Sequence, residues 1–279
     1  QMTRKHVTVA LSGDGGDESF AGYQHYADLL AWSRLDTIPS SLRKLLAKFG
    51  QCVVRPFTHN NFAARLDRGL SMLSARDIKV RRDLSITTFK ASEKDALYSQ
   101  QFKSLIADSK YRIDRIAEYQ LGLEDSELDW LMRHDQSFYL PDCLMVKTDI
   151  ASMSNSLEVR APFLDHEFIE FAASIPVELK RDQSGGKIIL KEAVAELLPP
   201  ELLNKPKTGF GIPLADWLRT DLAPMLDDMI LSEKALKRGL FETAAVKKMV
   251  KDQISGARDW SNRLYALMFL ELWFREFID

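Results

Sequence analysis

Apolar residues follow two patterns along the chain. Residues 7–11 form a short, largely apolar run with β-branched side chains, which is typical of a strand buried on both faces inside a parallel sheet. Beyond this run the apolar residues recur at helical spacing, first over residues 19–35 and then in successive segments up to the end of the chain. The pattern therefore predicts one strand followed almost entirely by helices.

Capping and breaking residues predict where these helices begin and end. We expect Ser126 and Asp165 to cap helices, and we expect Pro141 to interrupt one. The segments predicted to be helical are 19–35, 40–50, 62–73, 92–102 opened by Ser92, 113–123, 126–139, 142–156, 166–173, 187–198 and most of 216–279.

An apolar stripe and a charge run predict which residues are buried and which face the solvent. Trp260, Leu264, Met268, Leu272 and Trp273 form a stripe that we interpret as core rather than as a cofactor-binding surface. The mixed charge run over residues 76–83 is interpreted as a solvated helix face, in preference to a nucleotide contact.

A glycine-rich turn follows the predicted strand. Residues 12–17 read S-G-D-G-G-D, so the order is strand, glycine-rich turn and helix, which points backbone N–H groups at an anion. Asp14, Asp17 and Glu18 would repel a bare polyphosphate. They fit such a loop if Mg²⁺ bridges an acid to the phosphates, or if one acid acts as a base. A tight turn with solvated acids is the alternative.

Composition narrows the class of protein. Of the 279 residues 46% are hydrophobic, which allows a sizeable core, and the net charge of −2 disfavours a nucleic-acid partner. The two cysteines, Cys52 and Cys143, form no C-x-x-C motif, so we expect a reducing, cytoplasmic location. The longest apolar run, residues 264–270, is too short to cross a membrane.

Four motifs carry a resemblance to a known family. S-G-D-G-G-D-E followed by F-A-G-Y resembles the second nucleotide-site motif of the glutamine-dependent asparagine synthetases. Residues 140–165, a lysine at the start of a helix behind Ser-Gly-Gly, and the K-P-K-T-G-F-G-I-P loop at 205–213 resemble later stretches of that family in the same order. The resemblance is thin between residues 36 and 125.

The resemblance implies an α/β nucleotide-binding fold of the adenine nucleotide α-hydrolase type, predominantly helical and with one or few parallel strands. Residues 7–35 would carry the strand–loop–helix motif and residues 36–279 a mostly helical remainder. In that family a glutaminase domain and a first nucleotide loop, S-G-G-x-D-S, precede these motifs, and neither is present in this sequence. We therefore expect a C-terminal piece of a longer protein, inactive alone, whose missing part supplies the partner strands. A homodimer formed at the open strand edge is a further hypothesis.

The implied reaction is an AMP-forming ligation. ATP with Mg²⁺ would adenylate the side-chain carboxylate of aspartate, and ammonia from glutamine would convert the adenylate into asparagine. The resemblance implies that Ser12, Gly13 and Gly15 meet the nucleotide and that Asp17 holds Mg²⁺. Asp14 would handle a proton or organise the intermediate, and Lys187 would stabilise charge on the phosphorus and the acyl carbon. A lysine beside a helix N-terminus opposes the helix dipole, which favours such a role over a plain surface lysine.

Further cations and acids are candidates for the same site. Lys147 and Asp149 lie in an apolar segment and, with Arg160, form either a pairing network that braces the next loop or a set of nucleotide and acyl contacts. Lys205 and Lys207 either close over phosphates or keep their loop soluble.

Two other functions stay open at this point. One is an amidotransferase of the same architecture that acts on another carboxylate, in a peptide or a surface sugar. The other is a non-catalytic helical interaction module, which the intact acids and Lys187 disfavour.

Overall fold

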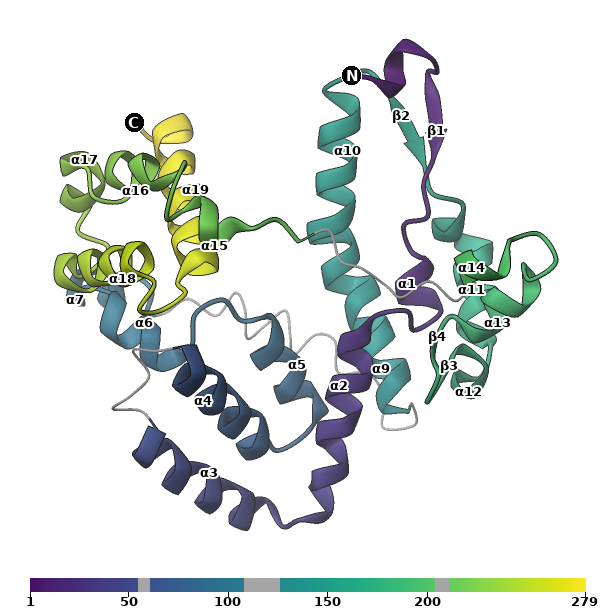
Figure 1. The fold of residues 1–279 in the computed structure, drawn as a ribbon, viewed down its shortest axis with the longest axis horizontal. Helices are drawn as coiled ribbons and strands as arrows, with labels where there is room; N and C mark the ends of the chain where they lie inside the picture. Colours follow the sequence, from purple (N-terminus) through teal and green to yellow (C-terminus); the bar gives the residue numbers. More distant parts are fainter. Residues whose placement is uncertain (55–60, 108–125, 204–210) are drawn as a thin grey trace. The chain divides into compact units, whose positions relative to one another are not determined.

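The computed structural model describes residues 1–54, 61–107, 126–203 and 211–279, and the chain divides into two units (Figure 1). Unit 1 comprises Gln1–Arg34 and Arg115–Thr208, and unit 2 comprises Leu35–Asp114 and Gly209–Asp279. Each unit is assembled from two separate stretches of the chain. The described residues are mainly helical with few strands, as the apolar pattern predicts.

Unit 1 contains two small two-stranded sheets among its described residues. β1 (Val9–Leu11) pairs in parallel with β2 (Glu158–Arg160), with Val9 opposite Glu158 and Leu11 opposite Arg160. β3 (Arg181–Asp182) pairs antiparallel with β4 (Gly185–Gly186). The helices of this unit are α1 (Gly16–Ser19), α2 (Gln24–Ser33), α9 (Glu127–His134), α10 (Val146–Met153), α11 (His166–Ser174), α12 (Val177–Lys180), α13 (Ile188–Ala193) and α14 (Pro200–Leu203), with single 3₁₀ turns at Thr3–Lys5 and Pro162–Leu164.

β1 is the predicted strand, but the expected burial is wrong. Val9 is 40% exposed and Leu11 is 74% exposed. The expectation that the partner strands lie entirely in absent sequence is also wrong, because β2 supplies one parallel neighbour. The residue before Pro162 is disfavoured in a helix, which agrees with the extended conformation of this segment.

The helix predicted over residues 19–35 is interrupted. α1 ends at Ser19 and α2 begins at Gln24, because Ala21 adopts a left-handed backbone conformation with φ of 52°. The Gly22 N–H donates to the Asp17 carbonyl at 2.8 Å and closes the turn. The chain thus reverses directly after the acidic motif.

α9 and α10 are joined by a π-helical segment, Asp135–Met145, which contains Pro141. Pro141 therefore lies inside a continuous helical stretch and does not break it. A π-helical turn accommodates an irregularity without ending a helix. Two predicted caps are confirmed: the Ser126 hydroxyl accepts from the Asp129 N–H at 3.1 Å, and the Asp165 carboxylate accepts from the Glu167 N–H at 3.0 Å.

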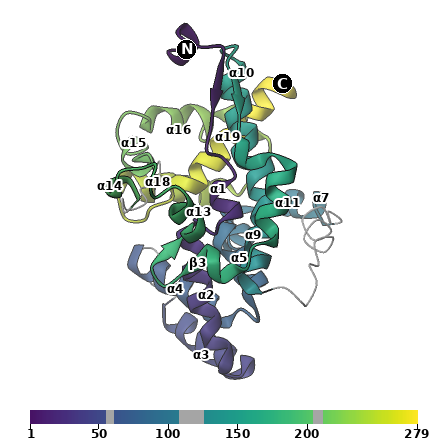
Figure 2. The same cartoon turned by 90° about the vertical axis from the view of Figure 1, so that its right-hand side faces the viewer.

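Apart from an isolated antiparallel bridge between Tyr98 and Phe241, the regular elements described in unit 2 are helices. Its elements are the 3₁₀ turn Arg34–Thr37 at the boundary with unit 1, then α3 (Ser40–Val54), α4 (Asn61–Ser74), α5 (Ile78–Ile86), α6 (Ala91–Leu97), α7 (Gln100–Leu105), α15 (Leu214–Trp217), α16 (Ala223–Met229), α17 (Glu233–Lys237), α18 (Thr243–Ser255) and α19 (Ser261–Phe277). α3 packs on α4, and both α16 and α18 pack on α19 (Figure 2).

The core of unit 2 centres on α19. Trp260, Leu264 and Met268 are buried in it, which confirms that part of the predicted stripe. Leu272 and Trp273 are about half exposed, so the predicted stripe extends too far. The remaining buried members of this core are Leu97, Leu218, Leu226, Met229, Ile230, Val246, Met249, Val250 and Leu267.

Several predicted boundaries in unit 2 are wrong. α3 runs through Gly50, and the segment predicted as one helix from Ser92 is two helices. The first begins at Ala91, where the Glu93 carboxylate accepts from the Lys90 N–H, and Ser99 caps the second. The helix predicted over residues 113–123 lies outside the described residues.

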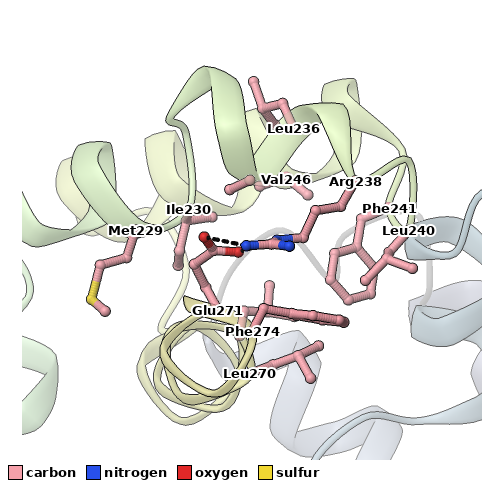
Figure 3. A pocket seen from close by; sticks show the side chains of 12 residues that line it. Met229, Ile230, Leu236, Arg238, Leu240, Phe241, Val246, Leu270, Glu271 and Phe274 are labelled. Atoms are coloured by element: carbon pink, nitrogen blue, oxygen red, sulfur yellow. Dashed lines mark hydrogen bonds and ion pairs between the residues drawn. The ribbon is translucent and has the colours of Figure 1, made fainter. Parts of the chain in front are cut away.

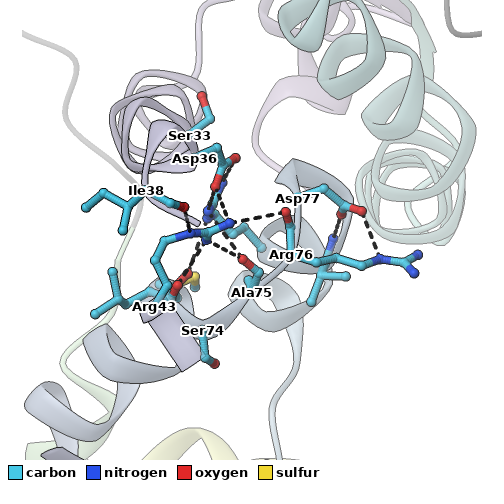
Figure 4. A network of polar contacts seen from close by, with 12 residues as sticks. Ser33, Asp36, Ile38, Arg43, Ser74, Ala75, Arg76 and Asp77 are labelled. Carbon is cyan, nitrogen blue, oxygen red and sulfur yellow. Dashed lines mark hydrogen bonds and ion pairs between the residues drawn. The ribbon is translucent and has the colours of Figure 1, made fainter. Parts of the chain in front are cut away.

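The interpretation of residues 76–83 as a solvated face is wrong for Arg81 and Arg82, which are buried. The Arg81 guanidinium makes a bidentate pair with the Asp36 carboxylate at 2.8 and 2.5 Å, and Arg43 contacts the same carboxylate at 2.9 Å (Figure 4). Arg43 also donates to the carbonyls of Leu73 and Ala75. Two buried arginines thereby join the start of unit 2 to α4 and α5.

Candidate functional site

The glycine-rich loop begins where β1 ends. The Ser12 N–H donates to the Arg160 carbonyl at 2.8 Å, which continues the parallel pairing with β2 and fixes the start of the loop. The Ser12 hydroxyl donates to Asp14 Oδ2 at 2.9 Å, and the Gly16 N–H donates to the Gly13 carbonyl at 3.3 Å. The loop is therefore a short turn in which the Ser12 hydroxyl orients the Asp14 carboxylate.

The three glycines of the loop have different surroundings. Gly13 is exposed, and a Cβ atom there would meet nothing within 4 Å. Gly15 is buried with φ of 89°, and a Cβ atom there would overlap the Leu164 side chain; a Cβ on Gly16 would lie 3.4 Å from the Phe163 ring. The open side of the loop is thus at Gly13, whereas Gly15 is needed for conformation and packing.

Lys187 is brought to the other end of this loop. It adopts a left-handed conformation directly before α13, with φ of 63°, and its N–H donates to the Phe20 carbonyl at 2.8 Å. Its ammonium nitrogen lies 3.2 Å from Asp17 Oδ1. The structure therefore joins two of the predicted site residues that lie far apart in the sequence.

Two glycines allow this approach. A Cβ atom on Gly186 would overlap the Ala21 carbonyl, and one on Gly22 would overlap the Asp17 carboxylate and the Lys187 side chain. We did not identify either glycine as a site residue from the sequence. The motifs F-A-G-Y and Ser-Gly-Gly contain both, but only the tertiary contact shows why glycine is needed.

A cavity of about 450 Å³ adjoins the open side of the loop. Ser12, Asp14 and Asp149 line it, so three predicted site residues meet there. The other lining residues are Pro141, Met145, Val146, Thr148, Ser152, Val159 and Ala161. A mainly apolar wall with a few polar groups is typical of a small-molecule site.

The predicted network of Lys147, Asp149 and Arg160 is absent from the described residues. The Arg160 guanidinium instead pairs with Glu158 at 2.7 Å, and both side chains are exposed. Lys147 is exposed on α10 and does not line the cavity. Lys205 and Lys207 lie outside the described residues.

A buried polar network lies directly behind the loop, and the sequence analysis missed it. Glu18 is 1% exposed, and its carboxylate accepts a hydrogen bond of 2.6 Å from the Tyr23 hydroxyl. Burial raises the pKa of the Glu18 carboxyl, and burial together with this carboxylate raises the pKa of the Tyr23 hydroxyl. The His25 ring stacks on Tyr23 and its Nε2 lies 2.9 Å from the buried Asp135 carboxylate.

Over the described ranges, no three His, Cys, Asp or Glu side chains converge as a metal site. Asp17, the predicted Mg²⁺ ligand, is in contact with Lys187. Mg²⁺ in nucleotide sites is usually held by one or two carboxylates together with substrate phosphates, so the side chains of this loop would supply only part of its coordination.

A second, much smaller cavity lies in the core of unit 2 (Figure 3). It has a volume of about 30 Å³, far below the range of about 300–1,000 Å³ that is typical of ligand pockets. Arg238 crosses it and makes a bidentate pair with Glu271 at 2.7 and 3.1 Å. Its size and this internal pair assign the cavity a structural role.

The loop, its contact with Lys187 and the adjoining cavity bring Ser12, Asp14, Asp17, Asp149 and Lys187 into one region of unit 1. The chain belongs to the asparagine synthase family: the family profile described as asparagine synthase matches residues 1–275. The chain is 27% identical, over 97% of its length, to asparagine synthetase [glutamine-hydrolyzing] 1 of Bacillus subtilis. It is 29% identical, over 99% of its length, to a putative asparagine synthetase [glutamine-hydrolyzing] of Mycobacterium bovis.

A relative with a different name also matches. Amidase chyE of Penicillium rubens is 25% identical over 88% of the chain. The chain spans about 40% of the length of the two synthetases and 38% of that of the amidase. No solved structure matches the chain. In the described part of the chain, no helix has the length and apolar character that membrane spanning requires.

Proposed function

We propose that this chain carries the ligase part of a glutamine-dependent, AMP-forming asparagine synthetase. In this proposal ATP adenylates the aspartate side-chain carboxylate, and ammonia released from glutamine by another part of the enzyme attacks the adenylate. Membership of the asparagine synthase family supports the class of reaction. The observation that carries the assignment to residues is the approach of Lys187 to Asp17 at the end of the glycine-rich loop.

The loop would receive the nucleotide on its open side. Gly13 is exposed there, and nothing lies within 4 Å of the place that a Cβ atom on it would take. Ser12 lines the adjoining cavity. Lys187 sits at the other end of the loop, where its charge is balanced by Asp17. A phosphate entering this region would compete with Asp17 for the ammonium group, and Lys187 could then stabilise charge that develops on the phosphorus and the acyl carbon.

The acyl substrate would bind in the cavity of about 450 Å³ beside the loop. Asp14 lines this cavity and is held by the Ser12 hydroxyl, so its carboxylate is positioned to accept a proton from the attacking ammonia. Asp149 and Ser152 provide polar groups on the α10 wall. The family resemblance alone supports four further nucleotide contacts in this proposal, namely Lys147, Arg160, Lys205 and Lys207.

Mg²⁺ is part of the proposal through its chemistry, which is to neutralise charge on the phosphates of ATP. Asp17 is the residue that would hold it. Mg²⁺ would compete with Lys187 for this carboxylate, whose Oδ1 lies 3.2 Å from the ammonium group, so the substrate phosphates would supply most of its coordination.

The experiment is an assay of the full-length gene product with ATP, Mg²⁺, glutamine and aspartate, following AMP, pyrophosphate and asparagine. We expect all three products, and we expect them to be lost together in Asp17→Ala and Lys187→Ala. An enzyme that forms no AMP with any carboxylate would contradict the adenylation and favour a non-catalytic module.

A second candidate is an amide-forming enzyme of the same architecture that acts on another carboxylate. Membership of the asparagine synthase family supports an amide-forming ligase in general and leaves the acyl substrate open, which keeps this candidate. Release of AMP only when a different acid is offered would select this candidate. For the 279-residue chain by itself we expect no conversion of ATP to AMP, because its sequence contains no S-G-G-x-D-S loop.

A further inference from the structure

Unit 2 contains a cavity whose walls are strongly basic. Its volume is about 260 Å³, and five cationic side chains line it: Arg65, Arg68, Lys90, Arg258 and Arg263. Among the described residues, Asp259 is the single carboxylate of the lining. This is unexpected in a chain whose net charge is −2. All the residues concerned belong to unit 2, so the cavity is separate from the glycine-rich loop.

The nearby carboxylates do not balance these cations. Glu93 is shared by two arginines: its Oε1 lies 2.6 Å from Arg258 Nη2, and its Oε2 lies 3.2 Å from Arg263 Nε. Asp67 pairs with Lys90. The Asp259 carboxylate accepts from the Ser261 N–H at 2.9 Å.

The Asp252 carboxylate lies 3.5 Å from the Trp260 indole nitrogen and pairs with Lys248 at 2.7 Å. Among the described residues, the five lining cations face Asp259 of the lining and two adjoining carboxylates, Asp67 and Glu93, so two positive charges are in excess.

Two of the arginine side chains are held by neighbouring side chains, and two make no polar contact with the described residues. The side chains of Arg258 and Arg263 are only 14% and 12% exposed, and the Arg258 guanidinium lies 3.6 Å from the centre of the Trp260 ring. Arg65 and Arg68 are exposed at the rim and make no hydrogen bond or ion pair with any described residue. Rigid donors behind free guanidinium groups are suited to grip an anion in bidentate fashion.

A larger cavity of about 610 Å³ shares Arg68, Lys90 and Arg263 with the basic one. Apolar side chains, including Val80, Leu84 and Phe89, contribute to its wall. The basic cavity is smaller than the range of about 300–1,000 Å³ typical of whole-ligand pockets. The pair of cavities therefore fits a ligand with a compact anionic head and a larger organic part.

We propose that these two cavities form a binding site for a small phosphorylated metabolite, with its phosphoryl group on Arg65, Arg68, Arg258 and Arg263. The excess of two positive charges matches a phosphate dianion. Arginine forks match the geometry of phosphate oxygens, and an organic group attached to the phosphorus would occupy the larger cavity beside Phe89.

The test is calorimetric titration of the full-length protein at low ionic strength with three probes. Phenyl phosphate carries both the dianion and an organic body, inorganic phosphate lacks the body, and phenyl sulfate carries a single charge. We expect phenyl phosphate to bind to one site in this region, and both other probes to bind at least about tenfold more weakly.

The decisive variant is the double substitution Arg65→Gln and Arg68→Gln. Both side chains are exposed, so the melting temperature should stay within about two degrees of that of the unmodified protein. Affinity for phenyl phosphate should fall at least about tenfold. The matched control, Lys247→Gln with Lys251→Gln on the exposed face of α18, removes the same charge from the same unit and should change the affinity less than about twofold.

Any of three results would overturn the proposal. The first is the absence of binding of phenyl phosphate at concentrations up to about 10 mM. A titration to this concentration would detect even a complex with a dissociation constant of about 1 mM. The second is an unchanged affinity in the arginine variant. The third is a loss of binding in Lys187→Met instead, which would place the probe at the glycine-rich loop. None of these outcomes depends on whether the protein makes asparagine.

Discussion

The Lys187 ammonium group lies 3.2 Å from the Asp17 carboxylate, although one residue precedes α13 and the other belongs to α1. The contact is possible because the Lys187 backbone is itself tied to Phe20 and because Gly22 and Gly186 leave room for it. In the proposed function, Lys187 would exchange its contact with Asp17 for a contact with a phosphate of the nucleotide.

Replacement of Lys187 by Met should reduce the rate of AMP formation by about 10²–10³-fold, because a charge that stabilises the transition state is lost. Single-turnover measurement of AMP release by the full-length protein checks this. Lys191→Met is the matched control, since Lys191 lies one turn further along the same helix and is exposed. Equal losses in both variants would mean that the effect is not specific to the contact with Asp17.

Gly186→Ala should destabilise unit 1 by about 2–3 kcal/mol, because the added methyl group would overlap the Ala21 carbonyl, which is backbone and moves with difficulty. Gly22→Ala should cost about 1–2 kcal/mol, since the atoms in its way are the ends of side chains. Denaturant unfolding measures both changes. Gly211→Ala, where a Cβ atom would meet nothing within 4 Å, should be close to neutral, and a similar loss there would refute the packing explanation.

Asp36→Asn should lower the free energy of unfolding by about 2–3 kcal/mol at neutral pH, since it leaves the buried Arg81 without its carboxylate partner. The hydrogen bonds from Arg81 hold the pKa of the Asp36 carboxyl below its usual value.

The sign of the pH dependence follows from this lowered pKa. The unfolded chain takes up the proton first, so the stabilisation is complete above the unfolded pKa of about 3.9 and is lost as the pH falls through the folded pKa. The difference between Asp36→Asn and the unmodified protein should therefore shrink below about pH 4. Asp95→Asn, at an exposed position, is the control, and a difference that stays constant down to about pH 2 would be inconsistent with this role.

Glu18→Gln should keep or raise stability at neutral pH, whereas Glu18→Ala should lower it by about 1–3 kcal/mol. Burial raises the pKa of the Glu18 carboxyl, so the charged form is disfavoured in the folded state. Glu18 therefore lowers the free energy of unfolding more and more as the pH rises from the pKa of the unfolded chain through the pKa of the folded protein. Glutamine removes the charge and still accepts the hydrogen bond from Tyr23, which alanine cannot do.

Thermal unfolding at several pH values separates these two effects. The advantage of Glu18→Gln should vanish at acidic pH, where Glu18 itself is neutral. A variant that is less stable than the unmodified protein at every pH would show that the buried carboxylate is needed in its charged form.

Features that depend only on neighbouring residues in the sequence could be predicted correctly. The caps at Ser126 and Asp165 are confirmed because a cap depends only on the few residues that follow it. The pairing of β1 with β2 was not foreseen, because a strand of three residues gives no sign of its partner. Arg81 was expected in solvent because its charged neighbours resemble an exposed face, and its carboxylate partner lies on a different element.

For the candidate site, too, local motifs could be predicted from the sequence and tertiary contacts could not. Ser12, Asp14 and Asp149 were singled out from motifs and do line one cavity. The roles of Gly22, Gly186 and Glu18 depend on tertiary contacts that no spacing along the chain reveals. Lys147 and Arg160 were grouped because a charge in an apolar segment needs a partner, but the Arg160 guanidinium has a nearer partner in Glu158.

The interleaved layout of the two units has a consequence for how the chain folds. β1 cannot meet β2 until residues 158–160 are available, and the core of unit 2 cannot close until α19 has been added. Both units therefore depend on contacts of high sequence separation, which slow folding because the loop-closure entropy must be lost first. No single cut can release either unit as one continuous polypeptide, so unit 2 of a nascent chain should stay sensitive to proteases until α19 has left the ribosome.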